Sequence, residues 1–167
     1  MSQPMSVTTN GTVAVVFVPT IADLEEPSPT EISAVGSLDV SCYLAGDNAL
    51  NTETTESNVE DPRLCSKKVF EQPGDSTDTL EWTYVFNPDS PADNEAELEL
   101  VAGRKGFVVM RWGIDADQAF AAGDIVDVFP VILGVQRRNN PSRNSVHRIT
   151  QKCFVTGEVI RNAVVTT

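Results

Sequence analysis

The stretch AAGDIVDVFPVILGVQRRNNPSRNSVHRITQKCFVTG, residues 121–157, decides the fold of this chain. Ile125–Gln136 and Val146–Thr156 are rich in Val, Ile, Phe and Thr, which is typical of β-strands. Between them, Asn139–Ser142 supplies residues that favour turns. The pattern therefore predicts a long β-hairpin over about residues 124–156.

The two strands of this hairpin distribute their apolar residues differently. In the second strand Ile149 and Cys153 alternate with polar neighbours, as expected of a strand with one buried face. In the first strand the adjacent residues Val128 and Phe129 are both apolar and point to opposite faces. A small domain covers one face with its own core, so we expect the second face to contact a helix or a neighbouring subunit.

The remaining elements predict an α+β domain that is mainly β, built as a β-sandwich or barrel. One flanking helix is expected at about residues 91–102, because Ser90 and Pro91 are typical of a helix start and Gly103 of a helix end. A turn at Gln72–Asp75 is expected to join two short strands. The expected strands outside the hairpin are Val13–Val18, Leu38–Leu44, Lys67–Phe70, Leu80–Phe86, Phe107–Trp112 and Glu158–Val165.

The domain organisation follows from where the polar segments lie. We expect residues 1–11 to form a flexible N-terminal arm and residues 12–167 to form a single domain. Within that domain, residues 46–62 (GDNALNTETTESNVEDP) contain five acids, no base and few apolar residues. This composition predicts a long solvated loop, and loops beyond about 12–15 residues are usually functional or disordered.

Charge divides the chain into two unlike parts. Residues 1–100 hold 19 acids and three bases, and residues 101–167 hold five acids and nine bases, within a net charge of −12. Complementary patches suit head-to-tail association between copies. The simpler interpretation is that the acids keep the protein soluble and the two parts pair within one monomer.

Residues that do chemistry are scarce in this sequence. His147 is the only histidine, and Cys42, Cys65 and Cys153 form no CxxC pair, so we expect no enzyme activity, metal or cofactor. The apolar run Val13–Val18 is much shorter than the roughly 18 residues of a membrane span. We therefore expect a soluble, unprocessed protein with reduced thiols and no membrane contact.

One basic cluster has two possible roles. Its members, which fall within residues 137–152, are Arg137, Arg138, Arg143, Arg148 and Lys152. Such a cluster can contact phosphates, but Phe154 is the only aromatic residue near it and the whole chain is acidic. Salt bridges within the molecule or across a subunit interface are therefore favoured over DNA binding, and a subunit interface is our hypothesis.

Several segments carry a resemblance to a known family. They are Pro19–Leu24, Ser37–Val40, Arg111–Asp115, Ala121–Val131, Arg148–Ile149 and Phe154–Gly157. In this order they resemble the major tail tube protein of long-tailed (siphovirus-type) bacteriophages, particularly those of actinobacteria. The resemblance covers about residues 12–165.

The resemblance implies a β-sandwich subunit that forms hexameric rings. These rings would stack into the tail tube around the tape-measure protein, meet tail terminator and tail tip proteins, and later pass DNA without binding it specifically. The protein would be made in the host bacterial cytoplasm and end in the virion tail. Contacts between rings would involve the acidic loop, and the residues hypothesised for them are Thr52, Glu53, Glu56, Glu60 and Asp61.

Other functions remain open at this point. A tail terminator or a head decoration protein would share the β-rich character and the lack of catalytic residues. A carbohydrate-binding β-sandwich would need an exposed aromatic platform. Its candidate residues are Tyr43, Trp82, Tyr84 and Trp112.

Overall fold

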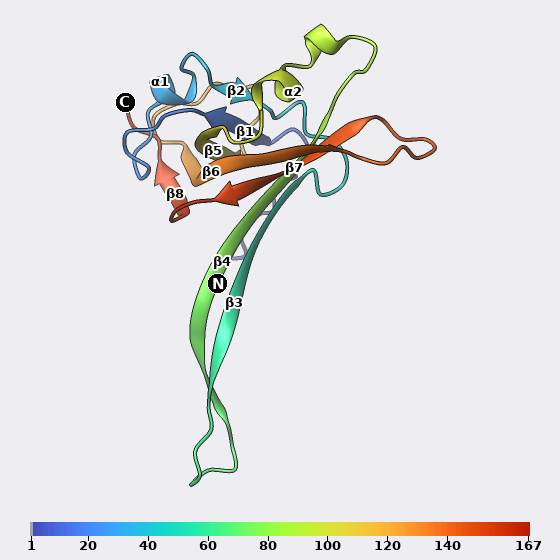
Figure 1. The fold of residues 1–167 in the computed structure, drawn as a ribbon. Helices are drawn as coiled ribbons and strands as arrows, with labels where there is room; N and C mark the ends of the chain where they lie inside the picture. Colours follow the sequence, from blue (N-terminus) through green and yellow to red (C-terminus); the bar gives the residue numbers. More distant parts are fainter. Residues whose placement is uncertain (1) are drawn as a thin grey trace.

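A computed structural model describes residues 2–167 and shows one antiparallel sheet with short helical segments at its faces (Figure 1). The helical segments are α1 (Pro29–Ile32), the 3₁₀ turn η1 (Pro91–Asp93) and α2 (Glu95–Glu99). The strands are β1 (Val13–Val18), β2 (Leu38–Asp39), β3 (Leu50–Asp61), β4 (Phe70–Val85), β5 (Lys105–Trp112), β6 (Ile125–Arg138), β7 (Arg148–Val155) and β8 (Ile160–Val164). The prediction of a mainly β fold is confirmed.

All eight strands belong to a single sheet in the order β2-β1-β5-β6-β7-β4-β3, with β8 paired to the first part of β6. The strands therefore do not divide into the two hydrogen-bonded sheets of a sandwich. The predicted hairpin is confirmed: β6 pairs with β7 in a register that places Val131 opposite Val155 and Leu133 opposite Cys153. A β-bulge between Leu133 and Gln136 shifts that register toward the hairpin tip.

Both apolar faces of β6 are covered by the chain itself. On one face Phe129 and Leu133 pack in a core with Trp82 and with Leu100, which directly follows α2. On the other face the core contains Val126, Val128, Val109, the α1 residue Ile32 and the C-terminal residue Val165. The expectation that a helix covers the second face is thus confirmed, with α1 on one side of the sheet and α2 on the other.

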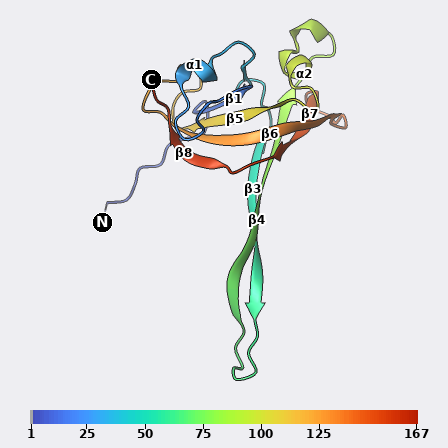
Figure 2. The ribbon, with the colours of Figure 1, turned by 60° about the vertical axis from the view of Figure 1, so that its left-hand side comes forward.

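The predicted solvated loop at residues 46–62 is wrong. Residues 50–61 form β3, which pairs with β4 as a two-stranded ribbon that projects far from the sheet (Figures 1 and 2). Both faces of this ribbon are exposed beyond its base, so its sequence lacks the apolar alternation that marks a half-buried strand. The ribbon, residues 51–79, is called the arm below.

The predicted turn at Gln72–Asp75 is also wrong, because β4 continues through it. Pro73 lies opposite Asn58, and the extra residues on β4 are accommodated by a register shift between Glu56 and Asn58. Proline is tolerated here because the outer edge of β4 is unpaired along the arm, where no partner needs its missing N–H. A side chain at Gly74 would collide with Ser57.

The predicted helix at 91–102 is shorter than expected. Asn94 interrupts it, since its buried side chain bonds both the N–H and the C=O of Asn87 (2.8 and 2.9 Å) and its backbone is not helical. Leu100 ends it in a non-helical conformation. The expected strand Leu38–Leu44 is likewise reduced to the two residues of β2 and an isolated bridge at Leu44.

Candidate functional site

The basic cluster of the hairpin tip is divided between contacts within the subunit and free charges. Arg138 bonds the Glu97 carboxylate at 3.0 Å and its guanidinium lies 4.8 Å from the centre of the Phe86 ring. Arg148 donates to the Ser145 hydroxyl at 2.8 Å and to the Ala45 carbonyl. These two arginines therefore hold the hairpin tip against its own domain.

Arg137 and Arg143 have no ion-pair partner within residues 2–167, and both are exposed. The Lys152 ammonium lies 5.2 Å from the centre of the Phe154 ring, on the outer face of β7. Arg137 shares this face, because it is in register with Thr150, two residues from Lys152. The structure thus brings Arg137 and Arg143 to the hairpin tip as free charges, whereas Lys152 lies further along the sheet.

The residues predicted for contacts between rings all lie on β3. Thr52 is at the base of the arm, opposite Leu80, and Glu53, Glu56 and Glu60 are exposed along its shaft. Asp61 ends the strand and bonds Arg63 at 2.7 Å. These side chains lie on a rigid ribbon, and not on a loop that orders only on assembly.

Sequence reasoning missed the tip of the arm, residues 62–70. It contains Arg63, Lys67 and Lys68, which are the only bases in the first 100 residues, and no acid. Its apolar side chains are exposed, including Leu64 completely and Phe70 at 57%. The signal was present as the isolated run of bases between two acidic segments, but the expected strand break at Gln72–Asp75 concealed that it caps a ribbon.

A contact at the base of the arm fixes how it leaves the sheet. Arg161 of β8 donates to the Thr54 hydroxyl at 3.1 Å and pairs with the Asp78 carboxylate at 3.3 Å. Thr54 and Asp78 are directly opposite each other in β3 and β4 and are hydrogen-bonded to one another. One arginine therefore braces both strands of the arm against β8.

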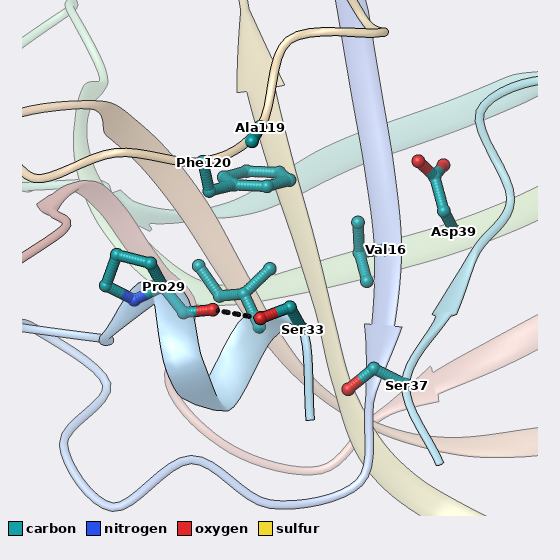
Figure 3. Close-up of a pocket in the computed structure, with 8 residues that line it drawn as sticks. Val16, Pro29, Ser33, Ser37, Asp39, Ala119 and Phe120 are labelled. Carbon is teal, nitrogen blue, oxygen red and sulfur yellow. Dashed lines mark hydrogen bonds between the residues drawn. The ribbon is translucent and has the colours of Figure 1, made fainter. Parts of the chain in front are cut away.

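A second recess lies on the α1 face, far from the arm. It is a cavity of about 270 Å³ lined mostly by apolar side chains, with Phe120 and Pro29 on one side and Val16 and Asp39 on the other (Figure 3). The Ser33 hydroxyl at its floor is already bonded to the Pro29 carbonyl at 2.7 Å. The lining contains no histidine or cysteine to serve as a nucleophile or base.

The titratable groups in the core are there for packing. Burial raises the pKa of the Cys153 thiol and of the Tyr84 hydroxyl, so both stay neutral at physiological pH. His147 is exposed at the hairpin tip against the Phe86 ring. Within residues 2–167 no three His, Cys, Asp or Glu side chains are grouped closely enough to hold a metal ion.

A sheet domain with a long charged ribbon projecting from it has the architecture of a protein that contacts other chains. The profile of the phage tail tube protein family matches residues 1–167. The chain therefore belongs to the phage tail tube protein family, a family of structural proteins and not of enzymes, and is a bacteriophage virion component.

Two solved assemblies contain chains with a similar fold. The sheath/tube terminator of an extracellular contractile injection system in its extended state superposes with a TM-score of 0.55 at 10% identity, covering 95% of this chain and 96% of that one. A chain of the six-fold symmetrised anti-feeding prophage baseplate gives 0.53 at 9% identity, covering 96% and 98%. A search of curated protein sequences returned no match. No helix among the described residues is long and apolar enough to cross a membrane.

Proposed function

We propose that this protein builds the tube of a long-tailed phage tail, as hexameric rings that stack around the tape-measure protein and later conduct DNA during ejection. The family match and the six-fold assembly that contains a similar fold support this proposal. Tail terminator and tail tip proteins would meet the two ends of the tube. Synthesis in the host cytoplasm and incorporation into the virion complete the proposal.

The arm is the observation that carries the proposal. Its strand β3 has 12 residues and therefore extends about 40 Å, with both faces in solvent beyond the base. An isolated two-stranded ribbon is at best marginally stable by itself in water. A ribbon of this length is explained if a second subunit packs against it, as stacking of rings requires.

The charge of the chain suits a conduit for DNA. Each subunit carries a net charge of −12, so a ring of six carries six times that charge. Negative charge facing the lumen repels phosphates and keeps DNA from adhering as it slides.

The alternative of a carbohydrate-binding module is not favoured by the aromatic residues. Trp82 and Tyr84 are fully buried, Tyr43 is half-buried, and Trp112 is exposed at 48% with its indole N–H bonded to Asp127. Four such side chains do not form an exposed platform. A terminator or a head decoration protein would instead end at a closed ring or join a capsid lattice.

Negative-stain electron microscopy tests the proposal together with a variant that lacks the arm. In this variant residues 56–76 are replaced by Asn-Gly, which closes the hairpin between the opposite residues Thr55 and Thr77. We expect the wild type to form long hollow rods of constant width. The variant should fold and form single rings at most, because the arm buries little core.

Two results would count against this proposal. A wild type that stays monomeric at high concentration, even with tail initiation components present, contradicts the tube. Loss of cooperative thermal unfolding in the shortened variant contradicts the assignment of the arm to assembly and makes it part of the core fold.

A further inference from the structure

The apolar cavity on the α1 face and the tip of the arm are complementary, and we propose that the cavity of one copy receives the arm tip of the next copy. The inference rests on the proposed function, because it names the two surfaces that hold successive rings together. Its partner is a second copy of this chain.

The arm tip combines positive charge with exposed apolar side chains. Lys67 and Lys68 have no ion-pair partner within residues 2–167, whereas Arg63 is paired with Asp61. Leu64 is fully exposed and Phe70 is exposed at 57%. Large apolar groups at the end of an otherwise polar ribbon mark a contact surface.

The cavity combines the opposite charge with an apolar interior. Its lining is mostly apolar, and Asp39 lies at its rim with an exposed carboxylate (Figure 3). The surrounding segment, residues 19–47, contains six acids and no base. Val35, in the loop between the lining residues Ser33 and Ser37, is fully exposed beside the opening. A volume of about 270 Å³ suits one leucine or phenylalanine side chain.

The cavity wall is held in place before any partner arrives. The Arg111 guanidinium is fully buried, pairs with Asp124 at 2.9 Å and lies 4.4 Å from the centre of the Phe120 ring. It also donates to the carbonyl groups of residues 115, 118 and 119. This network fixes the loop that carries Phe120, so binding needs little rearrangement of the wall.

The geometry excludes an intramolecular contact and favours a repeating one. α1 lies on one side of the sheet and the arm tip lies far out on the opposite side (Figures 1 and 2). The tip therefore cannot reach the cavity of its own subunit. A contact between two different surfaces on successive copies is heterologous and continues without closing, as a tube requires.

Two other surfaces compete for these roles. Residues 2–9 contain the exposed side chains Met5 and Val7, but no charge that would complement the acidic rim. The α2 region offers exposed Leu98 beside acids, but no cavity is found there. The combination of cavity and charge therefore selects the arm tip as occupant and the α1 face as receptor.

Cross-linking through the native thiol of Cys65, which is exposed in the arm tip, tests the contact. All chains carry Cys42→Ser to remove the other exposed thiol. One chain keeps Cys65, and a second, longer tagged chain carries Cys65→Ser with Val35→Cys. Mild oxidation of the mixture should give a disulfide-linked heterodimer. The matched control replaces Val35→Cys by Leu98→Cys, which places an equally exposed thiol near α2.

Charge variants of the tip show what holds the contact. We expect Lys67→Glu with Lys68→Glu to lower the heterodimer yield by about tenfold or more and to leave rings unstacked, because two attractive charges become repulsive. Lys67→Arg with Lys68→Arg should retain the cross-link and the tubes.

Each other result overturns the inference in a distinguishable way. Tubes without the Cys65 to Val35→Cys cross-link, or an equal cross-link to Leu98→Cys, exclude the α1 cavity while the proposed function stands. Tubes that survive the double glutamate variant but vanish on deletion of residues 2–9 make the N-terminal segment the occupant. A wild type that forms neither rings nor tubes removes the proposed function, and this contact with it.

Discussion

A single buried glutamine joins the sheet to the segment that covers it. The Gln151 side chain accepts from the Trp82 indole at 3.0 Å and donates to the carbonyls of Leu100 (2.7 Å) and Gly134 (2.9 Å). Its residue exposure is zero. Every polar atom of the side chain is therefore used, and the bulge at Gly134 is tied to the residue that ends α2.

We expect Gln151→Leu to destabilise the subunit by about 2–4 kcal/mol, because an apolar side chain leaves a buried indole N–H and two carbonyls with fewer partners. Urea unfolding of the monomer measures the effect. Lys152→Leu, on the exposed face of the same strand, should change the free energy of unfolding by less than about 0.5 kcal/mol. Equal stability of Gln151→Leu and the wild type would show that the network contributes nothing.

The role of Gln151 could be read only in part from the sequence. Alternation places it on the same face of β7 as Ile149 and Cys153, which are buried. A polar residue on a buried face predicts a hydrogen-bonded network. Its partners lie 17, 51 and 69 residues away in the chain, and only the sheet order brings them together.

At the scale of elements, the sequence predicts the strands that pack in the core and fails for the ribbon that does not. β1, β5, β6 and β7 were predicted because buried faces require runs of Val, Ile and Phe. β3 contains four threonines or valines between Asn51 and Val59, which favour strands. Because neither face of the arm is buried, no periodic apolar signal accompanies them.

The brace at the base of the arm leads to a prediction about its direction. The Arg161–Asp78 pair is partly exposed, so Arg161→Ala should lower stability by less than about 1 kcal/mol. The arm should nevertheless vary more in direction, since both strands lose their contact with β8. Pulsed electron paramagnetic resonance between a label on Cys65 and a second label on the sheet measures the distance distribution.

We expect that distribution to broaden in Arg161→Ala and to stay unchanged in Arg143→Ala, which removes an exposed arginine that has no ion-pair partner in the described chain. An unchanged width in Arg161→Ala would mean that the continuous strand β4 alone fixes the arm. In that case the brace has no mechanical role.

At the scale of the whole molecule, the unequal charge of the two parts of the chain serves two purposes. Of the ion pairs in residues 2–167, those of Arg104, Arg138 and Arg161 join a base from the second part to an acid from the first. The simpler interpretation of pairing within one monomer is therefore correct for these three. Charges without such partners, at the hairpin tip and the arm tip, remain for contacts between copies.

The separation of these free charges predicts that two steps of assembly can be blocked independently. The hairpin tip extends sideways from the sheet, whereas the arm points away from it (Figure 1). We assign the hairpin tip to contacts within a ring and the arm tip to contacts between rings. A charge reversal at one should leave the other step intact.

The last prediction concerns Arg137→Glu with Arg143→Glu. Arg138 is left unchanged because it holds the Glu97 carboxylate within the subunit. The double variant should fold with an unchanged melting temperature, since exposed charges contribute little to stability. It should fail to form rings, because like charges then face the acidic neighbour. Mass photometry measures the ring population, and Arg137→Lys with Arg143→Lys is the charge-conserving control.

Salt and DNA separate this role from its rival. Screening at high ionic strength should weaken wild-type rings in the same direction as the double variant, although buried apolar surface offsets part of the loss. If the arginines instead hold DNA inside the tube, the double glutamate variant assembles normal tubes and only DNA passage is impaired. Normal tubes from this variant would therefore refute the interface role of Arg137 and Arg143 and establish that their charge serves the lumen.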